Sequence, residues 1–211
     1  MDFKSLQYIK RSASIVLKNS FLLIFPVILG YFFYIPDPRT INVSNIMSIF
    51  LLLICYFPLA YGYLFEISVN QQRLSFFAIF KKHWLNVILV SFLFLITCFL
   101  VSFYIMQNIM FQFLFLLLAK VSIIYVIPLV YYKGVSFDNI IFRFKCFFGN
   151  ISFNTPLVTL SFSPMFFAIL LVGITGKANI QVHILVCIFE FFVNFVLFTS
   201  AVLILQDKVI E

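Results

Sequence analysis

Long apolar segments alternate with short polar segments along the whole chain, and this alternation predicts the architecture. A helix needs about 20 apolar residues to cross a hydrocarbon core about 30 Å thick, and six runs qualify. Because lipid cannot satisfy exposed backbone groups, each run is expected to be helical. The chain is therefore predicted to be an all-α, polytopic integral membrane protein, a single domain over residues 1–211 with six transmembrane helices. The runs cover roughly residues 21–35, 46–65, two spans within 87–132, 156–173 and 182–205.

Two of these runs have boundaries that the hydrophobic pattern alone does not fix. The first run is short, so we expect it to extend back through Ile15, with the ammonium of Lys18 reaching the membrane surface. The run over 87–132 has about twice the length of one span, and we expect it to turn at Gln107 and Asn108. No small-residue cleavage site follows the first run, which is therefore interpreted as a retained span and not as a signal peptide.

Three polar segments, ahead of the first, third and fifth spans, are each predicted to form a short amphipathic helix that ends near an asparagine. The asparagines, Asn19, Asn86 and Asn150, stand about 65 residues apart. This pattern indicates three units, each an elbow at the membrane surface followed by a helical hairpin. The alternative is that any cytoplasmic linker between spans becomes basic and amphipathic. The apolar faces are Leu6, Ile9, Ala13, Val16 and Leu17 in the first segment, Phe76, Ile79 and Phe80 in the second, and Phe137, Ile140, Ile141, Phe144, Phe147 and Phe148 in the third.

Composition and charge support membrane insertion and predict its orientation. Hydrophobic residues make up 64% of the chain and charged residues only 10%, against about 25% charged in a soluble domain. The net charge of +7 lies at the ends of spans, where anionic headgroups neutralise it, so we expect a lipid partner and no nucleic acid. Basic residues collect on the cytoplasmic side of a membrane, so an even span number predicts both termini in the cytoplasm, with the chain in the plasma membrane. Arg39 and Lys177 would lie outside, Lys120 within a span, and Lys4, Lys10, Arg11, Lys18, Arg73, Lys81, Lys82, Lys133, Arg143, Lys145 and Lys208 inside.

A loose family resemblance agrees with this architecture. Residues 58–66 (Pro-Leu-Ala-Tyr-Gly-Tyr-Leu-Phe-Glu) and 77–80 (Phe-Ala-Ile-Phe), with 13–19 and 125–130, resemble uncharacterised six-span bacterial membrane proteins. These are similar to the membrane domain of some glycerophosphodiester phosphodiesterases. The resemblance implies a six-helix bundle and supplies no active site, and without a soluble phosphodiesterase domain that activity does not carry over. The Gly-rich turn usual after the second span is here 69–73, which contains no glycine.

Two ionisable residues are predicted within spans, and they are the first candidates for a polar site. Lys120 and Glu190 would lie about 16 Å and about 12 Å below the outer ends of their helices, at 1.5 Å per residue. Such charges cost several kcal/mol unless they are paired or hydrated. His183 and Asn194 share a helix face with Glu190, and Gln112 lies two turns from Lys120. One interpretation is a structural ion pair, and the other is a hydrated cavity or ion path.

The remaining candidates are weaker. Lys81, Lys82, Arg143 and Lys145 are expected to contact lipid headgroups, and His83 with Trp84 is interpreted in the same way. The four cysteines lack metal-ligand spacing and are expected to be buried, reduced thiols. No nucleophile, metallopeptidase or phosphate-loop motif is present, so we expect no enzyme activity, cofactor or metal.

These observations leave three functional hypotheses. The first is a non-enzymatic integral membrane subunit that works with a partner membrane or ATPase subunit in transport, export or self-immunity. The second is a stand-alone carrier or channel whose polar site surrounds Lys120 and Glu190. The third is a scaffold whose basic elbows bind anionic lipid headgroups. A substrate-capture subunit of a modular importer is disfavoured, because the first span is too bulky for the docking helix of such proteins.

Overall fold

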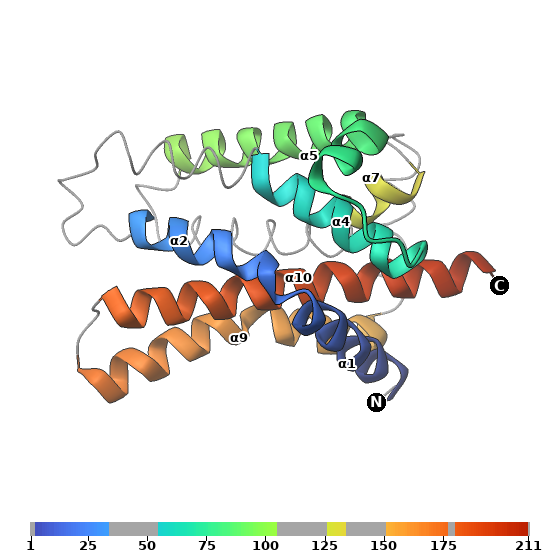
Figure 1. The fold of residues 1–211 in the computed structure, drawn as a ribbon. Helices are drawn as coiled ribbons and strands as arrows, with labels where there is room; N and C mark the ends of the chain where they lie inside the picture. Colours follow the sequence, from blue (N-terminus) through green and yellow to red (C-terminus); the bar gives the residue numbers. More distant parts are fainter. Residues whose placement is uncertain (1–2, 34–54, 105–125, 134–150, 177–179, 211) are drawn as a thin grey trace.

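The computed structural model describes residues 3–33, 55–104, 126–133, 151–176 and 180–210, and within these ranges the ordered elements are helices (Figure 1). The all-α prediction is confirmed for this part of the chain. The expected turn at Gln107 and Asn108 lies outside it. The helices are α1 (Phe3–Lys18), the 3₁₀ helix η1 (Ser20–Leu23), α2 (Ile24–Phe33), α4 (Phe57–Val69), α5 (Phe76–Tyr104), α7 (Ile127–Lys133), α9 (Ile151–Thr175) and α10 (Ile180–Ile210).

Three of the described helices are long and apolar enough to cross a membrane. The segments are Phe76–Leu93 in α5, Pro156–Thr175 in α9 and Ile180–Asp207 in α10. The predicted spans 156–173 and 182–205 agree with α9 and α10 to within a few residues at most ends. The described helices are therefore compatible with a membrane-embedded protein, and the count of six spans remains a prediction.

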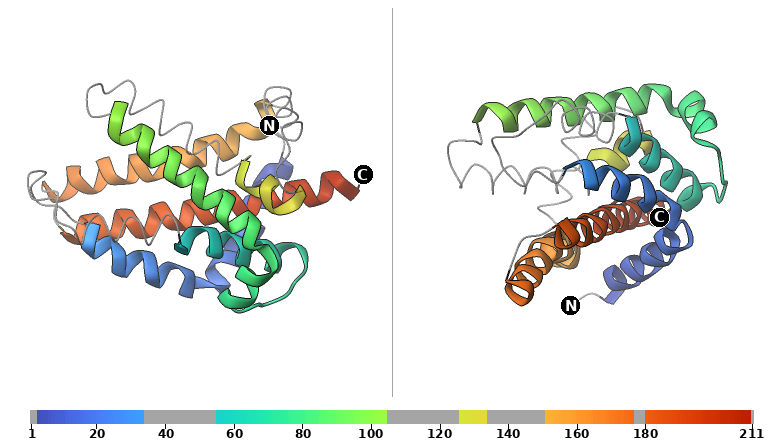
Figure 2. Two further views of the ribbon diagram at one scale, coloured as in Figure 1. Left: turned by 90° about the horizontal axis from the view of Figure 1, so that it is seen from above. Right: turned by 60° about the vertical axis from the view of Figure 1, so that its left-hand side comes forward.

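Helix α10 is the centre of the bundle. It packs against α1, α2, α4, α7 and α9, and α9 runs beside it in both views of Figure 2. Within its apolar window 72% of the residues are buried, against 22% in α5 and 17% in α9. Helices α5 and α9 therefore turn large apolar side chains outward, as helices in contact with lipid do.

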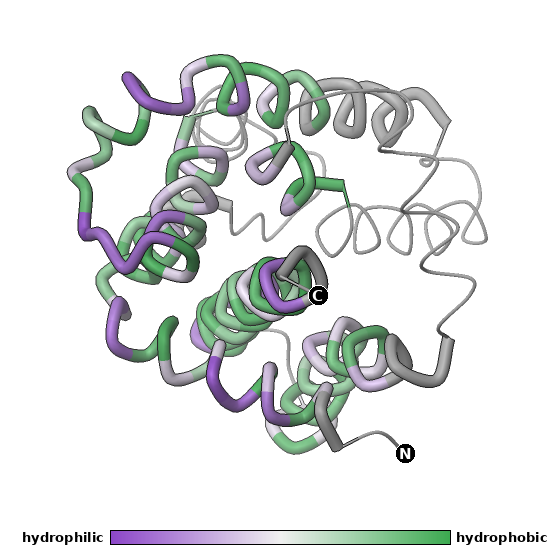
Figure 3. Tube along the Cα trace, turned by 90° about the vertical axis from the view of Figure 1, so that its right-hand side faces the viewer, coloured by the Kyte–Doolittle hydropathy of each residue, from purple (hydrophilic) through white to green (hydrophobic). Residues whose placement is uncertain are grey.

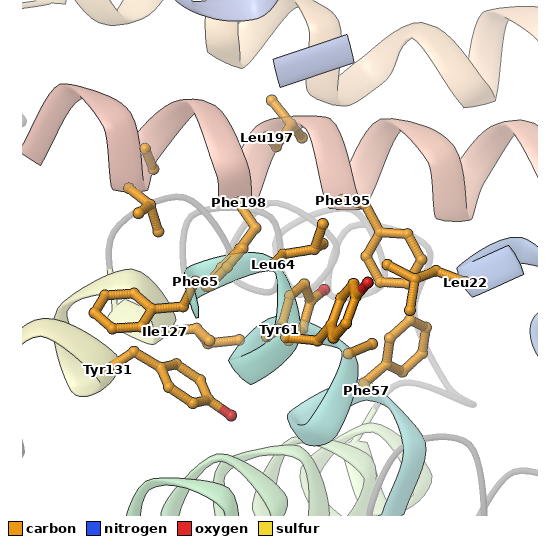
Figure 4. Close-up of a cluster of buried hydrophobic side chains, with 14 of the residues drawn as sticks. Leu22, Phe57, Tyr61, Leu64, Phe65, Ile127, Tyr131, Phe195, Leu197 and Phe198 are labelled. Carbon is orange, nitrogen blue, oxygen red and sulfur yellow. The ribbon is translucent and has the colours of Figure 1, made fainter. Parts of the chain in front are cut away.

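A cluster of aromatic side chains joins α4 and α7 to α10 (Figure 4). The ring of Tyr61 lies 4.6 Å from that of Phe198 and 5.8 Å from that of Phe195, and all three side chains are buried. Tyr131 of α7 contacts Phe198 edge-on at 6.1 Å. Aromatic pairs at such distances contribute beyond the area that they bury, so this cluster fixes α4 against the central helix.

The first predicted elbow is present, and it corrects the expected first span. The chain bends by 81° between Ser5–Lys18 and Ser20–Ile28, with Asn19 at the bend. The first span therefore does not continue straight back through Ile15. Lys10, Arg11 and Lys18 are exposed on α1, and charged residues along a whole helix face do not suit the bilayer interior. Figure 3 shows hydrophilic positions interspersed along the helix that follows the N-terminus.

The second elbow lies within α5, three residues before the predicted position. The helix breaks at His83, whose backbone angles are φ −121° and ψ 25°, and not at Asn86. Residues 76–82 form the short helix before the break, and the long apolar helix follows it. The third predicted elbow, with its asparagine Asn150, lies outside the described residues.

The beginning of α1 and the end of α10 lie on the same side of the molecule (Figure 1). The hydroxyl of Tyr8 on α1 donates to Oδ2 of Asp207 on α10 at 2.5 Å. This bond links residues from the beginning and the end of the chain, and it holds the surface helix α1 against the central helix.

Candidate functional site

The most distinctive polar group of the described structure is the carboxylate of Glu66. Its side chain is fully buried, on the last turns of α4. Pro58 in the first turn of this helix suits a helix start, because proline lacks the N–H that would have no partner there. Helix α4 extends to Val69, four residues beyond the predicted end of the second span. Glu66 therefore lies just past the predicted span, at the end of the helix.

Three side chains donate hydrogen bonds to this carboxylate. Lys82 Nζ and Asn70 Nδ2 each lie 2.9 Å from Oε2 of Glu66. His83 Nε2 lies 2.6 Å from Oε1. A carboxylate accepts and does not donate, so Nε2 of His83 carries the hydrogen. Both oxygens are thus occupied by donors from α4 itself and from the break in α5.

These contacts keep Glu66 ionised. Burial by itself raises the pKa of a carboxyl group, because it disfavours the charged form. The hydrogen bonds from Asn70, His83 and Lys82, with the charge of Lys82, outweigh burial and hold the pKa of Glu66 below its ordinary value. A general acid working near neutral pH needs the opposite shift. The arrangement therefore suits an anchor and not a proton donor.

His83 is enclosed by aromatic rings as well as by the carboxylate. Its ring contacts Phe65 and Tyr131 edge-on, each with centroids 5.8 Å apart. The hydroxyl of Tyr131 donates in turn to the carbonyl of Pro58. Only 11% of the His83 side chain is exposed, so the structure places it inside the bundle and not against lipid headgroups as expected. Trp84, the next residue, is 54% exposed, and its expected position at the membrane interface stays a prediction.

The backbone at the end of α4 supports the same glutamate. The carbonyl of Glu66 accepts the N–H groups of Asn70, at 2.9 Å, and Gln72, at 3.3 Å. Gln71 between them takes the left-handed conformation, with φ at +54°. Glycine usually fills such a helix end, so Gln71 carries the strain of the turn in which the sequence lacks a glycine.

One turn earlier on α4, Tyr63 holds the first elbow. Its hydroxyl donates to Oδ1 of Asn19 at 3.1 Å. Nδ2 of Asn19 donates to the carbonyl of Ile15 at 2.8 Å, which caps the end of α1. The same end of α4 thus binds both elbows, one through Tyr63 and the other through Glu66. We call these contacts the first clasp (Tyr63 and Asn19) and the second clasp (Glu66 with Asn70, Lys82 and His83).

Gly62 lets α4 come close enough to form the second clasp. A Cβ atom at this position would lie 2.7 Å from Cγ2 of Ile79 and 3.2 Å from Cε1 of Tyr131. Such distances are shorter than van der Waals contact. Ile79, fully buried, belongs to the short helix before the break in α5, so a side chain at residue 62 would push this elbow away from α4.

The candidates predicted within spans are only partly described. On α10, Nδ2 of Asn194 donates to Oε1 of Glu190 at 3.1 Å, and Sγ of Cys187 lies 3.5 Å from Nε2 of His183. A polar stripe therefore exists on this helix. Lys120 and Gln112 lie outside the described residues, so the proposed ion pair between Lys120 and Glu190 remains a prediction.

Of the four residues expected to contact lipid headgroups, two lie among the described residues. Lys82 is bound to Glu66, although 45% of its side chain is exposed. Lys81 is exposed, while Arg143 and Lys145 lie outside the described residues. Cys55 and Cys187 are free thiols, and Cys55 is exposed, contrary to the expectation of burial.

The second clasp was missed by reasoning from the sequence, although a signal existed. Glu66 is an acid at the end of an apolar run, and Lys82 and His83 follow 16 and 17 residues later. Within the described residues, no group of three or more His, Cys, Asp or Glu side chains has an arrangement that could hold a metal ion. Comparisons of the chain with models of protein families, with curated proteins and with solved structures give no match.

Proposed function

We propose that the chain is a six-span protein of the plasma membrane with both termini in the cytoplasm. We further propose that it acts as a non-enzymatic subunit, together with a partner membrane or ATPase subunit, in transport, export or self-immunity. The three apolar helices support membrane insertion. The exposed basic residues of α1 and of the second elbow support a cytoplasmic position for that end of the bundle.

The observation that carries the non-enzymatic part is the use of polar side chains in the two clasps. Glu66, the fully buried carboxylate, is ionised and occupied by three donors. Asn19 likewise bonds Ile15 and Tyr63. Both groups fix one helix to another. Such a scaffold suits a subunit that presents a rigid membrane surface to a second protein.

The partner is tested by extracting the protein gently from its own membrane and weighing it by native mass spectrometry. A second protein at fixed stoichiometry is the expected result. A chain that emerges alone, and whose cellular level does not depend on any other membrane protein, would contradict the proposed subunit.

A separate flux experiment distinguishes this proposal from a stand-alone carrier. Liposomes that contain the purified chain alone are expected to pass no solute beyond the background of empty liposomes. Flux that disappears in Glu190→Gln, with an unchanged flux in the surface control Lys10→Gln, would favour the carrier hypothesis instead.

Orientation is tested by fusing a reporter that is active only in the cytoplasm to either end of the chain. Activity at both ends is expected. Activity at one end alone would mean that the two termini lie on opposite sides of the membrane. The number of spans would then be odd, which would refute the predicted topology.

A further inference from the structure

A cavity of about 490 Å³ lies between residues 55–59, at the start of α4, and residues 80–92 of α5. This volume is in the range of about 300–1,000 Å³ typical of sites for small molecules. The lining is apolar: it consists of Cys55 and Leu59 on one side and Phe80, Val87, Ile88 and Phe92 on the other. Ser91 also borders the cavity, but its hydroxyl donates to the carbonyl of Val87. The lining therefore suits a hydrocarbon chain.

The cavity opens sideways from the bundle. Phe80, Ile88 and Phe92 are 45%, 48% and 59% exposed. All three belong to the segment Phe76–Leu93, which is apolar enough to lie in a membrane. An acyl chain of the bilayer can thus enter the cavity from the side, without passing through the protein.

A positive charge stands beside the elbow end of this cavity. Lys81 follows the lining residue Phe80 directly, and it is exposed. Its neighbour Lys82 is bound to Glu66, whereas no acidic side chain pairs with Lys81 in the described ranges. Phe77 and Trp84, four residues before and three residues after Lys81 in the sequence, are 78% and 54% exposed. Exposed aromatic residues close in sequence to an exposed lysine are typical of the headgroup level of a membrane.

We propose that this cavity and Lys81 together bind one phospholipid with an anionic headgroup. One acyl chain fills the cavity between α4 and α5, and the phosphate meets the ammonium of Lys81 beside the indole of Trp84. Charge complementarity selects this occupant: the mostly apolar lining suits an acyl chain, and Lys81, which is exposed and has no acidic partner among the described residues, suits an anion. The inference rests on the proposed membrane location and not on the proposed partner.

The chain carries one tryptophan, Trp84, and it stands at the proposed site. Bromine on a lipid quenches tryptophan fluorescence at short range, so Trp84 reports which lipid lies beside it. The purified protein is placed in bilayers of phosphatidylcholine and phosphatidylglycerol, in which either lipid alone is brominated near the ester end of its acyl chains. At equal mole fraction, we expect the anionic lipid to occupy the site about fivefold more than the neutral lipid, the size expected for one lysine near an anionic surface.

Two variants separate the charge from the cavity. Lys81→Gln should abolish the preference for the anionic lipid, whereas Lys10→Gln, an exposed lysine on α1, should leave it unchanged. Ser91→Leu partly fills the cavity and should also reduce the preference, with Lys81 intact. An unchanged emission spectrum in bilayers without bromine confirms that each variant is folded.

Equal quenching by the two lipids in the unmodified protein would overturn the lipid site and leave the membrane location standing. An equal loss of preference in Lys10→Gln and Lys81→Gln would also overturn it, because the selectivity would then belong to the overall charge. Absence of quenching by either lipid would refute the membrane location of the elbow itself, so the two failures are distinguishable.

Discussion

The two described elbows are held by different chemistry. In each, one helix ends at a break, another helix follows, and a side chain from the end of α4 binds the break. The first clasp is a neutral hydrogen bond between Tyr63 and Asn19. The second clasp joins a buried carboxylate to an ammonium, an imidazole and an amide. Two breaks that contact the same helix are therefore held by different kinds of bond.

The difference predicts different energies and different sensitivities. A neutral hydrogen bond contributes about 1 kcal/mol, because folding exchanges it for bonds with water. Removing one partner of a buried charged group costs more, since the remaining groups lose their compensation. The first clasp should therefore be weak and insensitive to pH, and the second should be strong and sensitive to acid.

The largest effect is expected for Glu66→Ala. The substitution removes the acceptor of three donors, of which His83 is mostly buried, and should lower the free energy of unfolding by about 3 kcal/mol. Glu66→Gln keeps the size and one acceptor and should cost roughly half as much. Unfolding in a detergent titration measures both values. A loss below about 1 kcal/mol in Glu66→Ala would show that the second clasp is no stronger than the first.

A somewhat smaller loss is expected for Gly62→Ala. The added methyl group would overlap Ile79 and Tyr131, and overpacking of this kind costs about 1–3 kcal/mol. Gly173→Ala is the matched control, because a Cβ there meets nothing within 4 Å. Alanine is the better helix former, so the control should be neutral or stabilising. Equal losses in the two variants would contradict the close approach of α4 to the second elbow.

The first clasp should show a modest effect. Tyr63→Phe removes one neutral hydrogen bond and should cost about 1 kcal/mol. A double-mutant cycle with Asn19→Ala should give a coupling energy of similar size. The same cycle between Tyr63 and Lys82, which share no described bond, is the control and should give a coupling near zero. A coupling energy between Tyr63 and Lys82, with none between Tyr63 and Asn19, would refute the division of these contacts into two independent clasps.

Acid should produce the smallest effect, and between the two clasps it should act on the second. The pKa of Glu66 is lowered in the folded state, so its stabilisation is complete above the ordinary pKa of glutamate, about 4.3, and is lost as pH falls through the lower folded value. The protection of residues 76–82 against hydrogen exchange, measured relative to the intrinsic exchange rate at each pH, should therefore fall in acid more than that of α1. Glu66→Gln should remove this difference. An equal fall of protection in both helices would contradict it.

The all-helical class and the approximate positions of the long helices could be predicted from the sequence, because they depend on local hydrophobic patterns. The amphipathic spacing of α1 and the apolar runs of α9 and α10 identify helices that the structure contains. Asn19 marked the first bend correctly, since its side chain caps its own helix at Ile15. A cap of this kind lies within four residues and is visible in the sequence.

The second bend and its site were not predictable in the same way. The sequence pattern predicted the break at Asn86, but it lies at His83. The imidazole ring of His83 is hydrogen-bonded there to Glu66 of α4. Glu66 itself lies at the end of a span, so a search for charges within spans passed over it. Its three donors form one cluster only after α4 and α5 have packed, with Ile79 against Gly62. The sequence signal, an acid at the end of an apolar run followed 16 and 17 residues later by Lys82 and His83, does not by itself show that packing.

The central position of α10 has a consequence for synthesis. Helices leave the ribosome in chain order, and α10 follows all the other described helices that pack around it. The faces of α1, α2, α4 and α7 that contact α10 are thus synthesised before their common partner has been translated. During that interval these faces must be covered by one another or by other molecules. Assembly of this bundle is therefore a late event, completed when its last described helix arrives.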